Sequence, residues 1–205
     1  MGTEKFYLKK LNLIKLFIFL FLILNSLNLI ACDLSNIEQF LDKNIRFQVS
    51  YEQKFSDSTD SIKGNIYRDN DNIKVFSFVP REELIINRNQ IYRHDLEMDQ
   101  LVIQASEESM NQSPAFLLFN KPNTICDYFS KTNCSNESCQ YSDPLENFYL
   151  KKIKIDFVNQ RLKKIVYEDL FERISTINLF KYEQLDKKVS FEPEVSDKTE
   201  KIFLN

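Results

Sequence analysis

Glycine, histidine and tryptophan are scarce in this sequence, which limits the chemistry that it can support. Its 205 residues include two glycines, one histidine and no tryptophan. Because Gly2 and Gly64 stand far apart, no glycine-rich loop can cradle a phosphate, and nucleotide-loop enzymes are excluded. His94 alone cannot build a histidine-based catalytic triad or a multi-histidine metal site. We therefore predict a protein that is not an enzyme and that uses no cofactor or metal.

Long hydrophobic runs are also missing. The apolar stretch over residues 16–24 has nine residues and is too short to span a bilayer comfortably. Four lysines precede it, and a basic region followed by a short apolar region is typical of a secretory signal peptide. We therefore predict a signal peptide over residues 1–31 and one exported domain over residues 32–205. The alternative is a retained N-terminal anchor, in which the apolar stretch continues to Ile30 across three polar residues.

The chain has no excess of positive charge. Its 27 basic and 30 acidic residues give a formal net charge of −3. Residues 1–31 contain four lysines and one glutamate, so the domain that follows carries 23 basic and 29 acidic residues, a net charge of −6. An acidic surface repels phosphate backbones, and we expect no nucleic-acid partner.

Cysteines are few and unevenly placed. Three of the four, Cys126, Cys134 and Cys139, fall within a polar stretch, where an exported chain is readily oxidised. We predict one local disulfide among these three. The third thiol then either stays free or pairs with Cys32, and pairing requires that Cys32 is neither removed nor lipidated. A zinc site with His94 is a weaker reading, because the cysteines lack the closely spaced pairs of such sites.

Strand-like alternation is the main pattern after residue 45. In residues 46–55, Phe47, Val49 and Tyr51 alternate with polar residues, as in a half-buried strand. Further strands are predicted over residues 64–67, 73–79, 83–86, 91–95, 100–104, 148–157, 162–169, 173–182 and 188–193. The sequence therefore predicts a mainly β protein of the α+β class, built largely from antiparallel hairpins.

Two helices and a long loop interrupt the predicted strands. Residues 33–45 place apolar side chains at helical spacing along one stripe, which predicts an amphipathic helix. Residues 112–122 also predict a helix, because Ser113 can cap it, Pro114 suits its first turn and Pro122 lies beyond its end. A polar loop is expected over residues 121–146.

Several segments, taken in chain order, resemble the outer-membrane lipoprotein carrier family, the LolA-type periplasmic chaperones. They are FQVSYEQKFSD from Phe47, Gly64 in GNIY, the run from Pro80 to Ile103, the helix SPAFLLF and the closing KVSFEP. The resemblance covers most of residues 33–200. It implies an incomplete, strongly curved antiparallel β-barrel with a helical lid over its concave apolar face. It also implies a monomeric carrier in the periplasm.

The same resemblance implies a ligand, partners and a set of lining residues. The ligand would be the acyl chains of lipoproteins, received from an inner-membrane ABC lipoprotein-release complex and passed to an outer-membrane lipoprotein receptor. In residues 73–79 either Ile73 and Val75 or Phe76 and Phe78 face the cavity, and we favour the first pair, since that register keeps Lys74 outward. The predicted cavity residues are Phe47, Val49, Ile73, Val75, Phe76, Phe78, Leu84, Ile86, Tyr92, Phe116, Leu117 and Leu118.

The sequence departs from the family at the residue thought to hold the lid. Members usually have an Arg-Pro pair before the third strand, and its arginine is thought to bond to the lid backbone. Here Asp69 and Asn70 occupy that region, and neither can replace a guanidinium. Arg68 is close enough to be the candidate lid latch, although a charge at a strand end is more often simply solvated.

Two alternatives remain at this point. Residues 29–32, Leu-Ile-Ala-Cys, resemble a lipoprotein processing box, and acylation of Cys32 would give a membrane-anchored acceptor or tethered carrier of the same superfamily. Asp33 resembles the signal that retains lipoproteins at the inner membrane in enterobacteria. An exported thiol enzyme is the second alternative, which the lack of a Cys-x-x-Cys pair disfavours.

Overall fold

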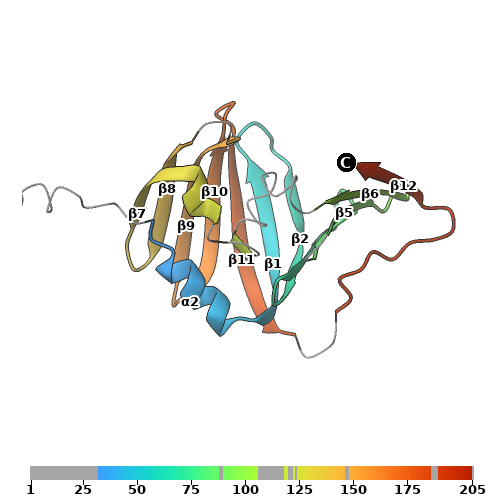
Figure 1. Ribbon diagram of the computed structural model, residues 1–205, viewed down its shortest axis with the longest axis horizontal. Helices are drawn as coiled ribbons and strands as arrows, with labels where there is room; N and C mark the ends of the chain where they lie inside the picture. The colour runs from blue at the N-terminus through green and yellow to red at the C-terminus, as the bar shows by residue number, and fades with distance from the viewer. Residues whose placement is uncertain are drawn as a thin grey trace, which may run out of the picture. The chain divides into compact units, whose positions relative to one another are not determined.

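A twelve-stranded open sheet, strongly curved, makes up most of the described structure (Figure 1). The computed structural model describes residues 32–87, 90–105, 118–119, 122, 124–145, 148–185 and 189–204. The predicted signal peptide, together with Phe116 and Leu117, lies outside the described residues. Within those ranges, no helix combines the length and apolar character needed to cross a bilayer.

Strand order is simple over most of the sheet. From one edge to the other the strands run β12, β6, β5, β4, β3, β2, β1, β11, β10, β9, β8, β7. Their bounds are β1 (Arg46–Phe55), β2 (Ser61–Asp69), β3 (Asn72–Ser77), β4 (Glu82–Ile86), β5 (Gln90–Asp95), β6 (Gln100–Ala105), β7 (Phe129–Cys134), β8 (Ser138–Pro144), β9 (Leu150–Val158), β10 (Arg161–Asp169), β11 (Ile174–Gln184) and β12 (Glu200–Leu204). Pairing is antiparallel throughout except between β12 and β6, which are parallel. The prediction of a mainly β protein with an open, curved sheet is confirmed.

The first strand shows how the sequence pattern becomes structure. β1 has the bounds that the alternation predicted, and it buries Phe47, Val49 and Tyr51 on one face. It occupies the middle of the sheet, with β2 on one side and β11 on the other. One strand thus joins the N-terminal meander to the C-terminal one.

Two helices fall within the described residues, α2 (Ser35–Lys43) and α4 (Thr124–Tyr128). The α2 helix begins where the Asp33 carboxylate accepts a hydrogen bond from the Ser35 amide at 2.9 Å. Its apolar stripe buries Ile37, Phe40 and Leu41 in the core. The helical lid stays a prediction, because most of residues 112–122 lie outside the described ranges.

Two predictions about the second half of the chain were wrong. The stretch expected to be a polar loop over residues 121–146 contains α4 and the β7–β8 hairpin, where only alternate residues such as Cys139 and Tyr141 are buried. Residues 189–193 form no strand, whereas β12 was not predicted. β12 is a mostly exposed edge strand, so its sequence carries no alternation of apolar and polar residues.

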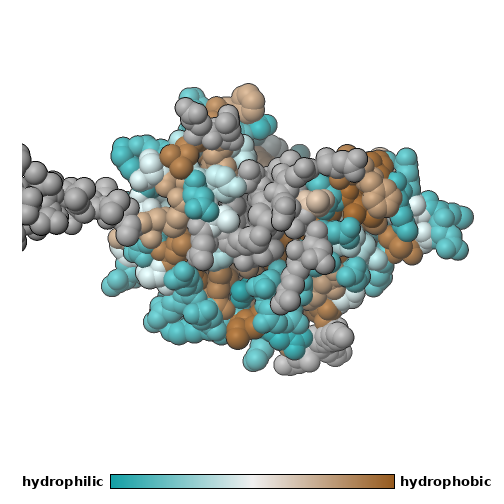
Figure 2. All heavy atoms as spheres, in the orientation of Figure 1, coloured by the Kyte–Doolittle hydropathy of each residue, from teal (hydrophilic) through white to brown (hydrophobic). Residues whose placement is uncertain are grey.

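The C-terminal strand is fastened to the sheet at Asp99. The Asp99 carboxylate accepts hydrogen bonds from Thr199 Oγ1 at 2.7 Å and Ser196 Oγ at 2.9 Å, and its carbonyl accepts one from the Glu200 amide. These bonds hold the pKa of Asp99 below its usual range, the Thr199 bond contributing most. Brown, hydrophobic side chains reach the surface over β12 in Figure 2, where Phe203 and Leu204 are exposed.

Candidate functional site: an apolar pocket on the concave face

A row of side chains crosses five neighbouring strands on the concave face. The register aligns Val49 of β1 with Ile66, Val75, Leu84 and finally Arg93 of β5. Side chains opposite each other in an antiparallel pair share a face of the sheet, so these five side chains form one row. We call it the cross-strand row.

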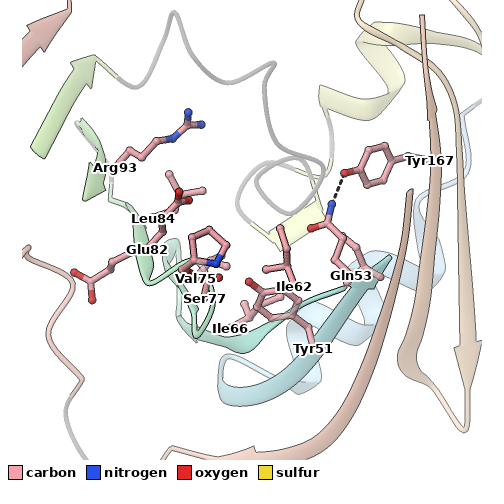
Figure 3. A pocket seen from close by; sticks show the side chains of 13 residues that line it. Tyr51, Gln53, Ile62, Ile66, Val75, Ser77, Glu82, Leu84, Arg93 and Tyr167 are labelled. Carbon is pink, nitrogen blue, oxygen red and sulfur yellow. Dashed lines mark hydrogen bonds between the residues drawn. The ribbon is translucent and has the colours of Figure 1, made fainter. Parts of the chain in front are cut away.

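A pocket of about 360 Å³ lies over the outer part of this row. That volume falls near the lower end of the range for ligand pockets, roughly 300–1,000 Å³. Its walls come from both halves of the chain, because β1 brings β2 and β11 together. The lining residues are Tyr51, Gln53, Ile62, Ile66, Val75, Ser77, Pro80, Glu82, Glu83, Leu84, Arg93, Tyr167 and Ile177 (Figure 3).

The polar groups of the pocket largely satisfy one another. Gln53 Nε2 donates to the Tyr167 hydroxyl at 2.8 Å, and Ser77 Oγ donates to the Pro80 carbonyl at 2.6 Å. Burial raises the pKa of Tyr51 and of Tyr167, so both phenols stay neutral at neutral pH. This part of the lining can therefore lie against an apolar ligand without leaving the side-chain polar groups of Gln53, Ser77 and Tyr167 unpaired.

The predicted cavity residues divide into four sets. Val75 and Leu84 line the pocket. Phe47, Val49, Ile73, Ile86 and Leu118 are buried in the core cluster that includes α2 and Phe119, and they do not line the pocket. Phe116 and Leu117 lie outside the described residues.

Phe76, Phe78 and Tyr92 lie elsewhere. Phe76 is paired with Glu83, and Tyr92 with Ile85, and alternation places all four on the face opposite Val75. Phe78 follows the end of β3 and is about half exposed. Its ring packs against that of Phe76, with 5.7 Å between the ring centroids. These three aromatic residues are therefore not part of the described pocket.

Several lining residues were missed by the sequence analysis. Tyr51 and Gln53 continue the buried face of β1, and the alternation had already assigned Tyr51 to that face. Tyr167 and Ile177 belong to strands more than a hundred residues later, so only the β1–β11 pairing brings them to the pocket. Nothing in the sequence signalled that pairing.

Arg68, the candidate latch, is buried on the concave side of the sheet, between β2 and the end of α2. Its Nη1 donates to the carbonyls of Leu41 at 3.1 Å and Asn44 at 2.8 Å, and its Nε donates to the Phe119 carbonyl at 3.1 Å. Its side chain thus joins β2 to the end of α2 and to the short helical piece at residues 118–119. Burial lowers the pKa of Arg68, yet an arginine remains protonated at any ordinary pH.

All four cysteines form disulfides. Cys32 is bonded to Cys126 across 94 residues, and Cys134 is bonded to Cys139 across the β7–β8 hairpin. Of the two fates open to the third loop thiol, the structure shows pairing with Cys32. Thioether acylation of Cys32 needs the same Sγ atom, so the disulfide and a lipid anchor exclude each other.

We expect Cys126→Ser to release one thiol, at Cys32, and to lower the free energy of unfolding by roughly 2–4 kcal/mol, because the lost crosslink closes a long loop. Alkylation and intact mass before reduction would detect the thiol, and urea unfolding would measure the loss. A Cys139→Ser variant is the control, since its crosslink closes a loop of only a few residues. A diacylglyceryl group on Cys32 of the unaltered exported protein would contradict the expectation.

The fold and pocket define a class: an open half-barrel that curves around an apolar concave face. The chain belongs to the outer membrane lipoprotein carrier protein LolA family, whose sequence model matches residues 46–191. No curated protein matches the chain significantly.

Solved structures similar to this chain have low sequence identity to it. An uncharacterized conserved protein from Thermus thermophilus has a TM-score of 0.58 and 7% identity, over 82% of this chain and 97% of that one. A LolA superfamily protein from Nitrosomonas europaea has a TM-score of 0.42 and 12% identity, over 75% and 94% of the two chains. MucB of Pseudomonas aeruginosa, solved in complex with MucA, has a TM-score of 0.46 and 9% identity, over 78% and 59%.

Proposed function

We propose that the protein is a periplasmic carrier that binds the acyl chains of lipoproteins in the pocket on its concave face. The observation that carries the proposal is this pocket, lined by Ile62, Ile66, Val75, Leu84 and Ile177 in a member of the lipoprotein-carrier family. An acyl chain cannot cross water unaided, because each exposed methylene costs about 0.8 kcal/mol. The apolar side chains of the pocket would remove that cost without any catalytic group.

The proposal extends to the partners and to Arg68. Cargo would come from an inner-membrane ABC lipoprotein-release complex and leave to an outer-membrane lipoprotein receptor. Arg68 would act as the lid latch, since it bonds to backbone carbonyls of α2 and of Phe119, both packed on the concave side. Breaking these bonds would let the covering segments move apart and enlarge the pocket.

A tethered carrier is the second candidate, favoured by the processing box at residues 29–32. It requires that Cys32 carries lipid instead of its disulfide to Cys126. The two candidates use the same pocket and differ only in where the protein is held.

A charge on the apolar floor of the pocket should weaken acyl binding. Val75 is half-buried and lines the pocket, so we expect Val75→Glu to weaken binding of a fluorescent acyl probe at least tenfold, which corresponds to about 1.4 kcal/mol. Tyr92→Glu is the matched control, because Tyr92 is also half-buried but lies on the opposite face. Melting temperatures would show that both variants fold. Unchanged binding by Val75→Glu, or equal loss in both variants, would refute the site.

A further inference from the structure

The cross-strand row changes character at its outer end. Ile66, Val75 and Leu84 form an apolar floor, and the next side chain along the row is Arg93. Neighbouring strands lie about 4.8 Å apart, so Ile66 and Arg93 are separated by roughly 14 Å across three strand spacings. A molecule that lay along the row would therefore meet apolar side chains over most of its length and a guanidinium at one end.

Arg93 is the one basic residue among the described residues that line the pocket. Its side chain is exposed, and no hydrogen bond or ion pair joins it to another described residue. Glu83, a neighbouring acid, forms a buried ion pair with Lys74. The register pairs Glu82 with Ser77, so Glu82 lies on the same face as Leu84 and Arg93. In Figure 3 the Arg93 guanidinium extends on the same side as Leu84. Because no ion pair joins Arg93 to Glu82 in the described structure, the guanidinium donors are available to a ligand.

The net negative charge of the chain makes the positive charge of Arg93 important for binding an anion. The whole chain has a net charge of −3, so an anion gains nothing from the general field of the protein. A guanidinium, by contrast, offers parallel N–H donors that match two oxygens of a carboxylate or a phosphate. An anionic group is consequently held at this end of the pocket only if Arg93 binds it.

We infer that the pocket prefers acyl lipids that end in an oxyanion, with the chain along the cross-strand row and the oxyanion on Arg93. This inference rests on the proposed function and extends the ligands of the pocket from lipoprotein acyl chains, which carry no oxyanion, to anionic acyl lipids. Neutral acyl lipids would occupy the same apolar floor and lack the bond to Arg93. A fatty-acid carboxylate and a phospholipid phosphate share the required chemistry.

Binding of matched lipid pairs tests the inference. Palmitate is compared with methyl palmitate, and palmitoyl lysophosphatidic acid with monopalmitoylglycerol, each displacing a fluorescent acyl probe from the full exported protein. We expect the anionic member of at least one pair to bind roughly three- to tenfold more tightly, because a partly exposed charge pair contributes modestly. The pair with the larger ratio identifies carboxylate or phosphate as the preferred group.

Variants at position 93 separate the contribution of the lipid head group to binding from that of the acyl chain. Arg93→Gln should bring the anionic lipids down to the affinity of their neutral partners, and Arg93→Lys should keep part of the preference. Arg81→Gln is the control, because Arg81 is exposed and does not line the pocket. Equal affinities within both pairs, or ratios unchanged in Arg93→Gln, would overturn the head-group preference and leave the carrier proposal intact. Failure of all four lipids to bind would overturn both.

Discussion

Replacing Arg68 by glutamine is expected to lower the free energy of unfolding by about 2–4 kcal/mol. The wild-type guanidinium satisfies the carbonyls of Leu41, Asn44 and Phe119, and these belong to two segments far apart in sequence. A glutamine amide is shorter and can reach at most part of this set. Each buried carbonyl left without a donor costs roughly 1–3 kcal/mol. Urea unfolding followed by circular dichroism would measure the loss.

Amide hydrogen exchange would show which parts of the structure lose stability. Without Arg68 the last turn of α2 loses its attachment to β2, so its amides should exchange faster while those of β9 and β10 keep their protection. Arg93→Gln is a suitable control, because Arg93 is exposed and its replacement should change stability by less than about 0.5 kcal/mol. Equal stability of the two variants would show that the three hydrogen bonds do not hold the helix, and the latch proposal would fail with them.

Gly64→Ala is expected to destabilise the protein by roughly 2–4 kcal/mol, because there is no room for a methyl group at this position. A Cβ on residue 64 would overlap the carbonyl oxygen of Phe76 and would lie 2.8 Å from Cε1 of Tyr51. The neighbour on one side is backbone, which cannot turn away as a flexible side chain can. The strain would fall on β2 and on the Tyr51 wall of the pocket.

A double variant separates the two contacts. In a Tyr51→Leu background the ring contact is gone, but the overlap with the Phe76 carbonyl remains, so Gly64→Ala should still cost most of its original amount. Lys63→Ala serves as the matched control, since Lys63 is the exposed neighbour in the same strand. Thermal and urea unfolding of the wild type, the two single variants, the double variant and the Lys63→Ala control would give the comparison. A Gly64→Ala protein as stable as the wild type would mean that β2 and β3 separate easily at this point.

The sequence correctly predicted elements that bury one face by themselves. The prediction failed where burial depends on segments that are distant in the sequence. β1 follows from alternation alone, because Phe47, Val49 and Tyr51 need a core on one side only. The β7–β8 hairpin does not, since its side chains are mostly polar. Arg68 illustrates the same limit for the site: a charge at the end of a strand normally lies in water, and only the arrival of α2 and Phe119 surrounds it with carbonyls.

The choice of disulfides was open for the same reason. Four cysteines, three of them in one polar stretch, allow several pairings, and spacing does not distinguish them. The pair Cys32 and Cys126 becomes evident only when the residues before α2 lie beside the β7–β8 hairpin, where the Tyr141 hydroxyl donates to the Asp33 carbonyl at 2.8 Å. In the same way, the sequence alone does not single out Arg93, because its proposed role depends on the apolar side chains of the cross-strand row next to it.

The parallel pairing of β12 with β6 imposes an order on folding. Gln100 and Glu200, which are paired in the register and joined by a side-chain hydrogen bond, are separated by 100 residues. The antiparallel neighbours along the chain can pair through short turns, but β6 must wait with an open edge until the last strand of the sheet has been synthesised. During that interval Val102 and Ile103 lie on an unpaired edge that could join another chain. Association during folding should therefore be strongest in chains truncated before residue 200.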